Sequence, residues 1–155
     1  DYAVTGVQTC ALPIFRDPYM REDLQDFGIM TDTLECSVTW ETMEAVHEGV
    51  RAYCKSRPNT ICMTHMSHVY PQGANLYFIF IAKMDDIDAY LAYQAGILDN
   101  ILKYGASMSH HHGIGKAFAP WLEKQIGTNQ LDVFRALKKH FDPHEIMNPG
   151  GTLGL

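Results

Sequence analysis

Three consecutive histidines, His110–His112, form the stretch of this chain with the clearest chemical potential. Histidine is the side chain whose ordinary pKa lies closest to neutrality, so it can accept or donate a proton near pH 7. Ser109 precedes the run, and Gly113, Gly115 and Lys116 follow it. Glycine tolerates positive φ and lets the backbone approach a ligand closely. The pattern therefore predicts a tight turn that leads into a helix and carries titratable side chains.

Three interpretations of this turn are open: a catalytic or cofactor-contacting turn, a metal site, and a solvated loop. Adjacent residues of an extended chain point to opposite faces, so only His110 and His112 could share one metal there. No Cys-x-x-Cys or His-Glu-x-x-His motif accompanies them. We therefore favour the catalytic or cofactor-contacting turn and predict no metal site.

Composition narrows the class of protein. The chain has 155 residues, of which 46% are hydrophobic and 19% charged, as in a single globular domain with a buried core. Its net charge of −6 argues against a nucleic-acid partner. No apolar run approaches the ~20 residues of a transmembrane segment. We expect a cytoplasmic protein, with peripheral membrane association left open. The cysteines lack metal-ligand spacing and are interpreted as reduced thiols: Cys10, Cys36, Cys54 and Cys62.

Hydrophobic periodicity predicts alternating strands and helices. Strands are expected over 29–40, 60–70, 75–83 and 106–109, and helices over 41–56, 86–104, 116–126 and 129–140. The first six of these in chain order give β-α-β-β-α-β, an α+β ferredoxin-like unit: a four-stranded antiparallel sheet of order 4-1-3-2 with two helices on one face, followed by C-terminal helices. The expected core comprises Leu34 or Cys36, Ile79 or Phe80, Leu91 and Leu98.

The first fourteen residues stand apart from this pattern. Residues 4–14 resemble the direct translation of a common sequencing adapter. The segment lacks a basic start, so it is a poor signal peptide. We expect residues 1–14 to be non-native and to pack poorly, and genuine protein to begin near Phe15. The chain would then be the C-terminal piece of a longer protein.

Several stretches together resemble a known family. They are residues 15–19, 32–40, 73–78 and 109–116, followed by the closing Asp142-Pro143 and Asn148-Pro149-Gly150. The combination is similar to the C-terminal cap domain of FAD-linked oxidases of the vanillyl-alcohol-oxidase type. Within that group it looks most like the alkyldihydroxyacetonephosphate synthases (alkylglycerone-phosphate synthases) and their bacterial relatives. The triple histidine is the specific part, since the wider group usually carries one histidine before its Gly-x-Gly.

The resemblance implies a domain assignment and a reaction. Residues 15–155 would form the substrate or cap domain, and the FAD-binding domain would lie upstream and be missing, so the fragment alone would be inactive. The cofactor would be FAD, and the substrate a small or lipid-like molecule of ether-lipid synthesis. The implied reaction exchanges an acyl for an alkyl group through a flavin adduct. A homodimer is left open.

The resemblance also implies site residues. Tyr77 matches the family's acid-base tyrosine, and Arg16 its substrate-binding arginine. His110, His111 and His112 match active-site histidines, of which His111 and His112 would contact the flavin together with Asn148. Simpler interpretations exist: a strand aromatic for Tyr77, a salt bridge for Arg16, and a plain turn for Asn148. In the expected sheet, Tyr77 and the histidines would converge on one open concave surface.

Two alternatives to the synthase remain. The first is an FAD-dependent oxidase or dehydrogenase of a hydroxy acid or alcohol, and the second is a non-catalytic ferredoxin-like binding module. The tail departs from the common form, because no lysine follows Asn148-Pro149-Gly150. It also lacks a peroxisomal Ser-Lys-Leu terminus.

Overall fold

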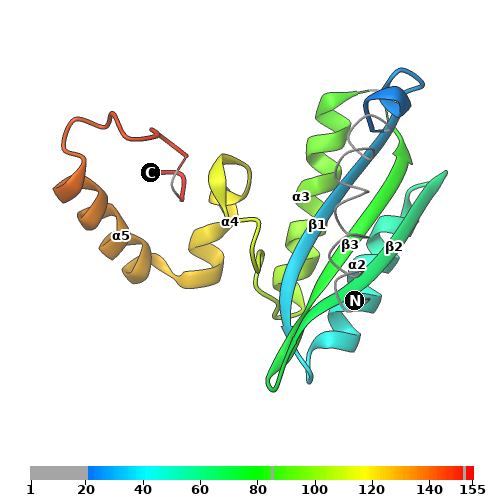
Figure 1. Cartoon of the computed structure of the whole chain (residues 1–155), viewed down its shortest axis with the longest axis horizontal. Coiled ribbons are helices and arrows are strands. Elements are labelled where there is room, and N and C mark those ends of the chain that lie inside the picture. The colour runs from blue at the N-terminus through cyan, green and yellow to red at the C-terminus, as the bar shows by residue number, and fades with distance from the viewer. Residues whose placement is uncertain (1–20, 85, 152) are drawn as a thin grey trace, which may run out of the picture.

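A three-stranded antiparallel sheet and its covering helices dominate the computed structural model, which describes residues 21–84, 86–151 and 153–155. The expectations for residues 1–14 and for Arg16 lie outside the described residues. The elements, in chain order, are β1 Ile29–Thr39, α2 Met43–Ser56, β2 Thr60–Tyr70, β3 Gly73–Lys83, α3 Ile87–Lys103, α4 Gly115–Ile126 and α5 Thr128–Phe141. They are arranged as Figure 1 shows. The predicted α+β order is confirmed.

The strand order is β1-β3-β2, and both pairings are antiparallel. This agrees with the expected order, in which the fourth strand lies beside β1. The fourth strand itself does not form in the described residues. Only an isolated bridge joins Ser107 to Ser37 of β1, through Ser37 N to Ser107 O at 3.2 Å and Ser107 N to Ser37 O at 3.0 Å. The chain then leaves the sheet edge.

Helices α2 and α3 cover one face of the sheet (Figure 1). Side chains alternate between the two faces of a strand, so the even-numbered residues of β1 and β3 face these helices. They are the buried Leu34, Cys36, Val38, Leu76, Phe78, Phe80 and Ala82. Helix α2 contributes Val46, Val50 and Cys54, and α3 contributes Tyr93, Ile97, Leu98 and Ile101. Leu34, Cys36, Phe80 and Leu98 are thus core residues as predicted.

The prediction for Leu91 is wrong, because this side chain is 51% exposed. The buried stripe of α3 runs through Tyr93, Ile97 and Ile101, which follow one another at four-residue spacing. Successive helical residues are rotated by about 100°, so Leu91 lies nearly opposite Tyr93. Apolar residues surround much of this helix, and periodicity alone therefore selected the wrong edge of the stripe.

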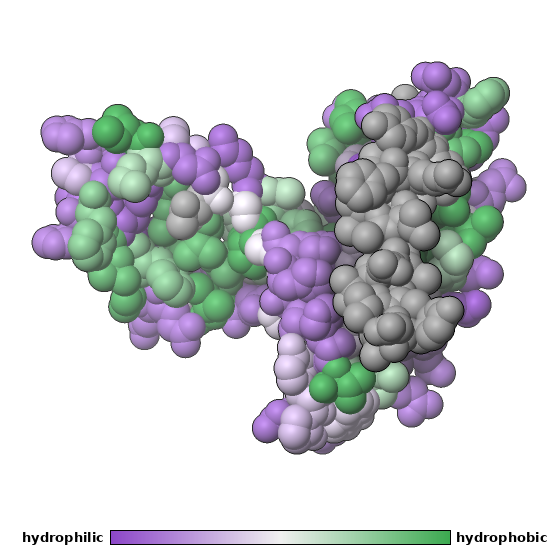
Figure 2. Space-filling model, in the orientation of Figure 1, coloured by the Kyte–Doolittle hydropathy of each residue, from purple (hydrophilic) through white to green (hydrophobic). Residues whose placement is uncertain are grey.

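Helices α4 and α5 form a helical unit beside the sheet, and the C-terminal segment folds back from α5 toward α4 (Figure 1). The indole Nε1 of Trp121 donates to Asp99 of α3 at 2.8 Å and links the two parts. Figure 2 shows hydrophobic side chains on the surface of this helical unit. The residues are Val133, Phe134, Leu137, Phe141, Ile146 and Met147. No helix of the described residues is long and apolar enough to cross a membrane.

Candidate active site

The face of the sheet opposite the helices carries the polar residues. Cross-strand pairing places Glu35 of β1 opposite Tyr77 of β3, and Tyr77 opposite His65 of β2. Directly paired residues of an antiparallel sheet project to the same side. A row of three titratable side chains therefore crosses this face of the sheet.

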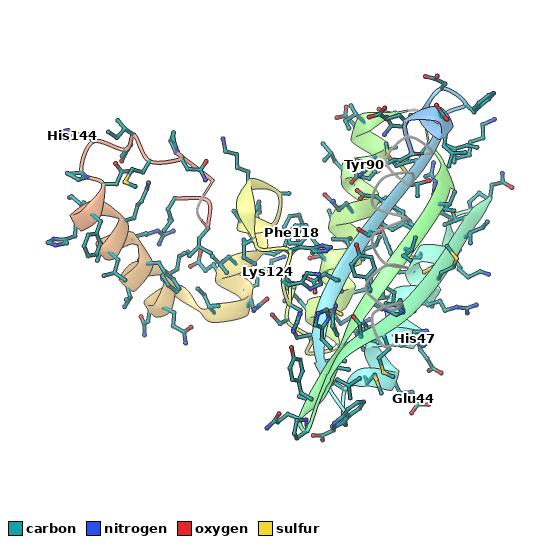
Figure 3. All side chains as sticks on the ribbon, in the orientation of Figure 1. Glu44, His47, Tyr90, Phe118, Lys124 and His144 are labelled. Atoms are coloured by element: carbon teal, nitrogen blue, oxygen red, sulfur yellow. The ribbon has the colours of Figure 1, made fainter. Side chains whose placement is uncertain are left out.

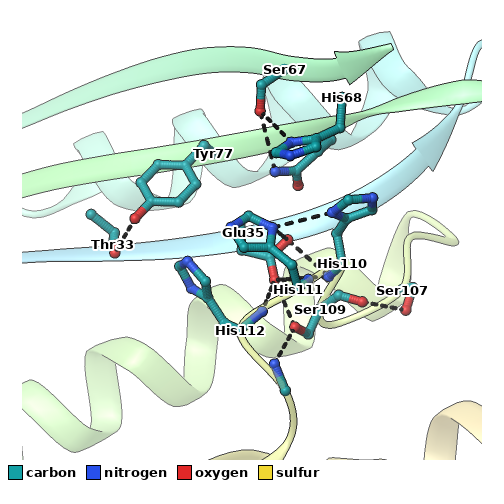
Figure 4. Close-up of polar contacts among 12 residues, drawn as sticks. Thr33, Glu35, Ser67, His68, Tyr77, Ser107, Ser109, His110, His111 and His112 are labelled. Atoms are coloured by element: carbon teal, nitrogen blue, oxygen red, sulfur yellow. Dashed lines mark hydrogen bonds and ion pairs between the residues drawn. The ribbon is translucent and has the colours of Figure 1, made fainter. Parts of the chain in front are cut away.

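The segment Ser109–Gly113, here named the histidine loop, is fastened to Glu35 (Figure 4). Oε1 of Glu35 accepts from Ser109 Oγ at 2.6 Å and from the backbone amides of His110, His111 and His112 at 2.7, 2.9 and 3.0 Å. Ser109 Oγ in turn accepts from Gly113 N at 2.9 Å. The amides that could have extended the sheet point at a carboxylate, which is why no fourth strand continues.

Glu35 is a charged group inside the protein, with 1% of its surface exposed. Burial alone raises the pKa of a carboxyl group, because it penalises the ionised form. The Ser109 hydroxyl and three backbone amides act in the opposite direction and hold the pKa of Glu35 below its ordinary value of 4.5. Glu35 is therefore a carboxylate at neutral pH, and the imidazole Nδ1 of His111 lies 3.7 Å from its Oε2.

Tyr77 lies against two of the three histidines. Its ring centroid is 6.5 Å from that of His111 and 5.3 Å from that of His112, which meets it edge-on. Its hydroxyl donates to Thr33 Oγ1 at 3.1 Å. The Tyr77 ring thus lies beside two of the histidines, whereas the prediction that its hydroxyl and a histidine share one open concave surface stays a prediction. The loop reaches over β1 and so brings the rings closer than the spacing of two strands would.

A second group gathers at the end of β2. The β2–β3 register shifts between Ser67 and Tyr70, and His68 within this irregularity has a φ of 49°. Such a bulge redirects a side chain. The His68 ring lies 4.8 Å from that of His110 and 5.1 Å from that of His111. The hydroxyl of Tyr70 lies 3.0 Å from His110 Nε2, and an open cavity of about 370 Å³ adjoins both side chains.

These histidines meet the distance requirement for a metal. One ring nitrogen each from His68, His110 and His111 lie within 4.8 Å of one another. The argument from alternation, which allowed only His110 and His112 to share a metal, is wrong because the loop is not extended. Nδ1 of His110 lies 3.1 Å from Nδ1 of His111, so neighbouring residues point the same way here.

The structure does not bring Asn148 to this group. It lies in the segment after α5, which folds back toward α4 and not onto the sheet (Figure 1). Its side chain instead lies over Gly151. His144, in the same segment, and His47, on the helix side, are likewise remote (Figure 3). The flavin contact of Asn148 stays a prediction.

The sequence reasoning missed Glu35, Thr33 and His68. A signal for Glu35 existed, because a carboxylate stands directly between the apolar residues Leu34 and Cys36. Its partners, a hydroxyl and three backbone amides, are 74 or more positions away, so no spacing could indicate them. His68 depends on a bulge that no local pattern announces. Asn75, on the central strand β3, was also missed. Its side chain is fully buried, and its Oδ1 has no hydrogen-bond partner among the described residues.

Comparison with known proteins identifies the family. The sequence matches the family described as "FAD linked oxidases, C-terminal domain" over residues 11–152. The chain belongs to this family. It is 34% identical over 141 residues to an alkyldihydroxyacetonephosphate synthase of Dictyostelium discoideum, covering 85% of this chain and 23% of that protein. It is 33% identical over 135 residues to an uncharacterized FAD-linked oxidoreductase of Escherichia coli (strain K12), covering 79% and 28%.

A solved structure of an alkyldihydroxyacetonephosphate synthase matches with a TM-score of 0.64 and 27% identity. The match covers 92% of this chain and 24% of that structure. The family predicted from the sequence is therefore confirmed, and the chain spans about a quarter of the length of these relatives.

Proposed function

We propose that this chain is the substrate-side domain of an FAD-dependent enzyme of the alkyldihydroxyacetonephosphate synthase type. The observation that carries the proposal is the Tyr77 ring held against His111 and His112 on a face that α2 and α3 leave uncovered. A phenol and several imidazoles are the groups that general acid–base chemistry at neutral pH uses. The match to synthases over most of the chain supports this branch.

The donor set fits one wall of a flavin site. Half-exposed imidazoles and a phenol offer flat surfaces and hydrogen bonds to a planar ring, and His111 keeps 42% of its side chain exposed. The glycines beside them are too few to cradle the phosphates of a dinucleotide. We therefore assign the binding of FAD mainly to a separate domain that precedes Phe15 in the parent protein. When bound, FAD supplies the electron-accepting ring beside which the substrate reacts.

The chain's own residues then have separate tasks. Tyr77 moves a proton at its hydroxyl oxygen, and Thr33 orients that oxygen. His112, edge-on to the phenol, and His111, beside the Glu35 carboxylate, provide the neighbouring polar environment. Arg16 stays the predicted ligand of an acidic substrate group, because a guanidinium pairs with phosphate or carboxylate.

The experiment begins by long-read sequencing of the gene upstream of Phe15, where we expect an FAD-binding domain. The full-length enzyme is then assayed for exchange of the acyl group of acyl-dihydroxyacetonephosphate for a labelled fatty alcohol. The exchange has no net redox change, so it should proceed without an electron acceptor. Product formed only from hydroxy acids, with reduction of an acceptor dye, would instead establish an oxidoreductase like the relative from Escherichia coli.

The acid–base role of Tyr77 is tested by a substitution that removes its hydroxyl. Tyr77→Phe should lower kcat by about 10²–10⁴-fold, the usual contribution of a general acid–base group. The FAD content, read from flavin absorbance, should not change, because the substitution removes one oxygen. Tyr104→Phe is the matched control, since Tyr104 packs over Gly49 of α2 on the other side of the sheet. Full activity of Tyr77→Phe would contradict the proposal and favour a binding module.

A further inference from the structure

A buried carboxylate next to the histidine loop has no part in the chemistry described so far. Glu35 lies under the loop, not at its surface, and 1% of it is exposed. It makes no contact that would let it reach a substrate directly. Ionised carboxylates are rarely buried without a strong compensating interaction, since their desolvation is costly. Its partners therefore indicate what its charge is used for.

Those partners belong almost entirely to one loop. The carboxylate accepts the amides of three successive residues, His110 to His112, and Oε2 takes a second contact from His110 N at 2.8 Å. In an extended strand, successive amides alternate in direction. Three that point to one acceptor require a curved backbone. The curvature turns the three imidazoles outward, toward Tyr77 and His68.

The same residue also fixes the loop relative to Tyr77. Glu35 and Tyr77 are directly paired across β1 and β3, so the strand register determines the position of the carboxylate beside the phenol. The loop also contacts β2, where the Tyr70 hydroxyl lies 3.0 Å from His110 Nε2. The bridge between Ser37 and Ser107 holds the chain just before the loop to β1. Glu35 is held in place by the paired strands, and its hydrogen bonds fix the position of the histidine loop, which has no regular secondary structure of its own.

We propose that Glu35 is a positioning residue, whose buried carboxylate shapes the histidine loop and sets its imidazoles against Tyr77. The functional part of this inference rests on the proposed acid–base role of Tyr77. The structural part, that the loop depends on Glu35, stands independently. The lowered pKa of Glu35 agrees with it, since the hydrogen bonds from the loop favour the ionised form.

The test compares Glu35→Gln with Asp142→Asn. Gln keeps the shape of Glu but turns one acceptor into a donor that faces backbone amides. Asp142 is a matched control, because it is also buried and accepts backbone amides, those of Ile146 and Met147, in a remote loop. Both variants are examined in the 155-residue chain by amide hydrogen exchange and by nuclear Overhauser contacts between Tyr77 and the histidine rings.

In Glu35→Gln we expect amide exchange at His110, His111 and His112 to accelerate by about tenfold or more, the scale of a charge-assisted hydrogen bond. The contacts from Tyr77 to His111 and His112 should weaken, while exchange in β3 and α2 stays slow. Asp142→Asn should leave the histidine loop unchanged. Protected loop amides and intact ring contacts in Glu35→Gln would overturn the inference. If Glu35→Gln does not fold, Ser109→Ala, which deletes one donor to the carboxylate, decides by the same two readouts.

A kinetic measurement separates positioning from general structural support. In the full-length FAD enzyme, Glu35→Gln should lower kcat by about tenfold or more with KM and FAD content unchanged, whereas Tyr104→Phe should leave kcat unchanged. An unchanged kcat alongside a released loop would overturn the functional part of the inference. Tyr77→Phe distinguishes the two proposals. If that variant stays active, the proposed function fails, but amide exchange and the ring contacts of Glu35→Gln still test whether Glu35 shapes the loop.

Discussion

Tyr77 donates its hydroxyl to Thr33 Oγ1 at 3.1 Å, across the β1–β3 ladder. The two residues are diagonal neighbours, because Tyr77 pairs with Glu35, two positions beyond Thr33 in β1. The phenol ring therefore lies against the histidines, while its hydroxyl oxygen points along the sheet toward Thr33. A substrate atom that reaches this oxygen would replace or share the Thr33 contact.

Substitution of this acceptor gives the first prediction. Thr33→Val keeps the shape of the side chain and removes the hydroxyl, so it should cost about 0.5–1.5 kcal/mol in the free energy of unfolding. It should also lower kcat of the full-length enzyme, by less than Tyr77→Phe does. Thr33→Ser retains the acceptor and should behave like the parent in urea unfolding and in the assay. Loss in Thr33→Ser but not in Thr33→Val would show that the methyl group, not the hydrogen bond, matters.

The second prediction concerns the pH dependence of stability. The pKa of Glu35 is lowered in the folded protein by the donors of the histidine loop. The free energy that this carboxylate contributes is therefore complete above its unfolded pKa and is lost as the pH falls through the folded pKa. We expect urea unfolding to show a decline in stability below about pH 4.5, the ordinary value.

A variant separates this contribution from others. The pKa of Asp142 is also lowered, mainly by its hydrogen bond from Lys138, so it titrates in the same acidic range. Glu35→Gln should reduce stability at pH 7 by about 1–3 kcal/mol and flatten part of the acid decline. A full acid decline in Glu35→Gln would assign the effect to Asp142 or other carboxylates.

The fold could be predicted from the sequence where local pattern and tertiary structure agree. Alternation gave β2 its bounds at Thr60 and Tyr70, and Asp86 caps α3 as expected, accepting from Asp88 N at 3.0 Å. The residues 106–109 failed as a strand for a non-local reason. The amides of the next residues, His110 to His112, donate to the Glu35 side chain of β1. Strand propensity, which depends on the local sequence, does not include this competition for hydrogen bonds.

The residue types of the candidate site could be predicted from the sequence, but their arrangement in space could not. The histidine run and Tyr77 were found from residue chemistry and family resemblance, and the structure places them together. His68 could not be found, because its orientation follows from a register shift and a φ of 49°. The sheet explains why Tyr77 and the loop meet, since pairing brings distant segments of the chain to one face.

The third prediction tests the register that aligns Tyr77 with Glu35. A Cβ added to Gly73, the first residue of β3, would lie 1.8 Å from the carbonyl oxygen of Val38. Backbone of a paired strand cannot yield easily, so Gly73→Ala should destabilise the protein by about 1–3 kcal/mol. Gln72→Ala, at the exposed neighbouring position, is the control. An unchanged urea midpoint in Gly73→Ala would mean that β1 and β3 can separate at this end without cost.

The last prediction concerns the order in which thiols react. Cys36, Cys54 and Cys62 are free and lie among the core residues between sheet and helices. Burial, together with the neighbouring charge of Glu35, raises the pKa of Cys36 to about 12. The pKa of Cys54 is also raised, by its hydrogen bond with Cys62 and by burial. The pKa of Cys62 is lowered, because the Cys54 thiol donates to it and Arg51 and Lys55 add positive charge.

The thiolate is the reactive form, so Cys62, which is also 9% exposed, should be the first of these three cysteines to be alkylated. Iodoacetamide at pH 8 should modify it roughly tenfold or more faster than Cys36 or Cys54, as measured by mass spectrometry of peptides from the folded protein. In urea the three described thiols should react at similar rates, because the differences come from the fold. Cys62→Ala should remove the fast phase. A fast phase that persists in that variant would assign it to another thiol, and faster labelling of Cys36 would contradict its burial between the sheet and the helices.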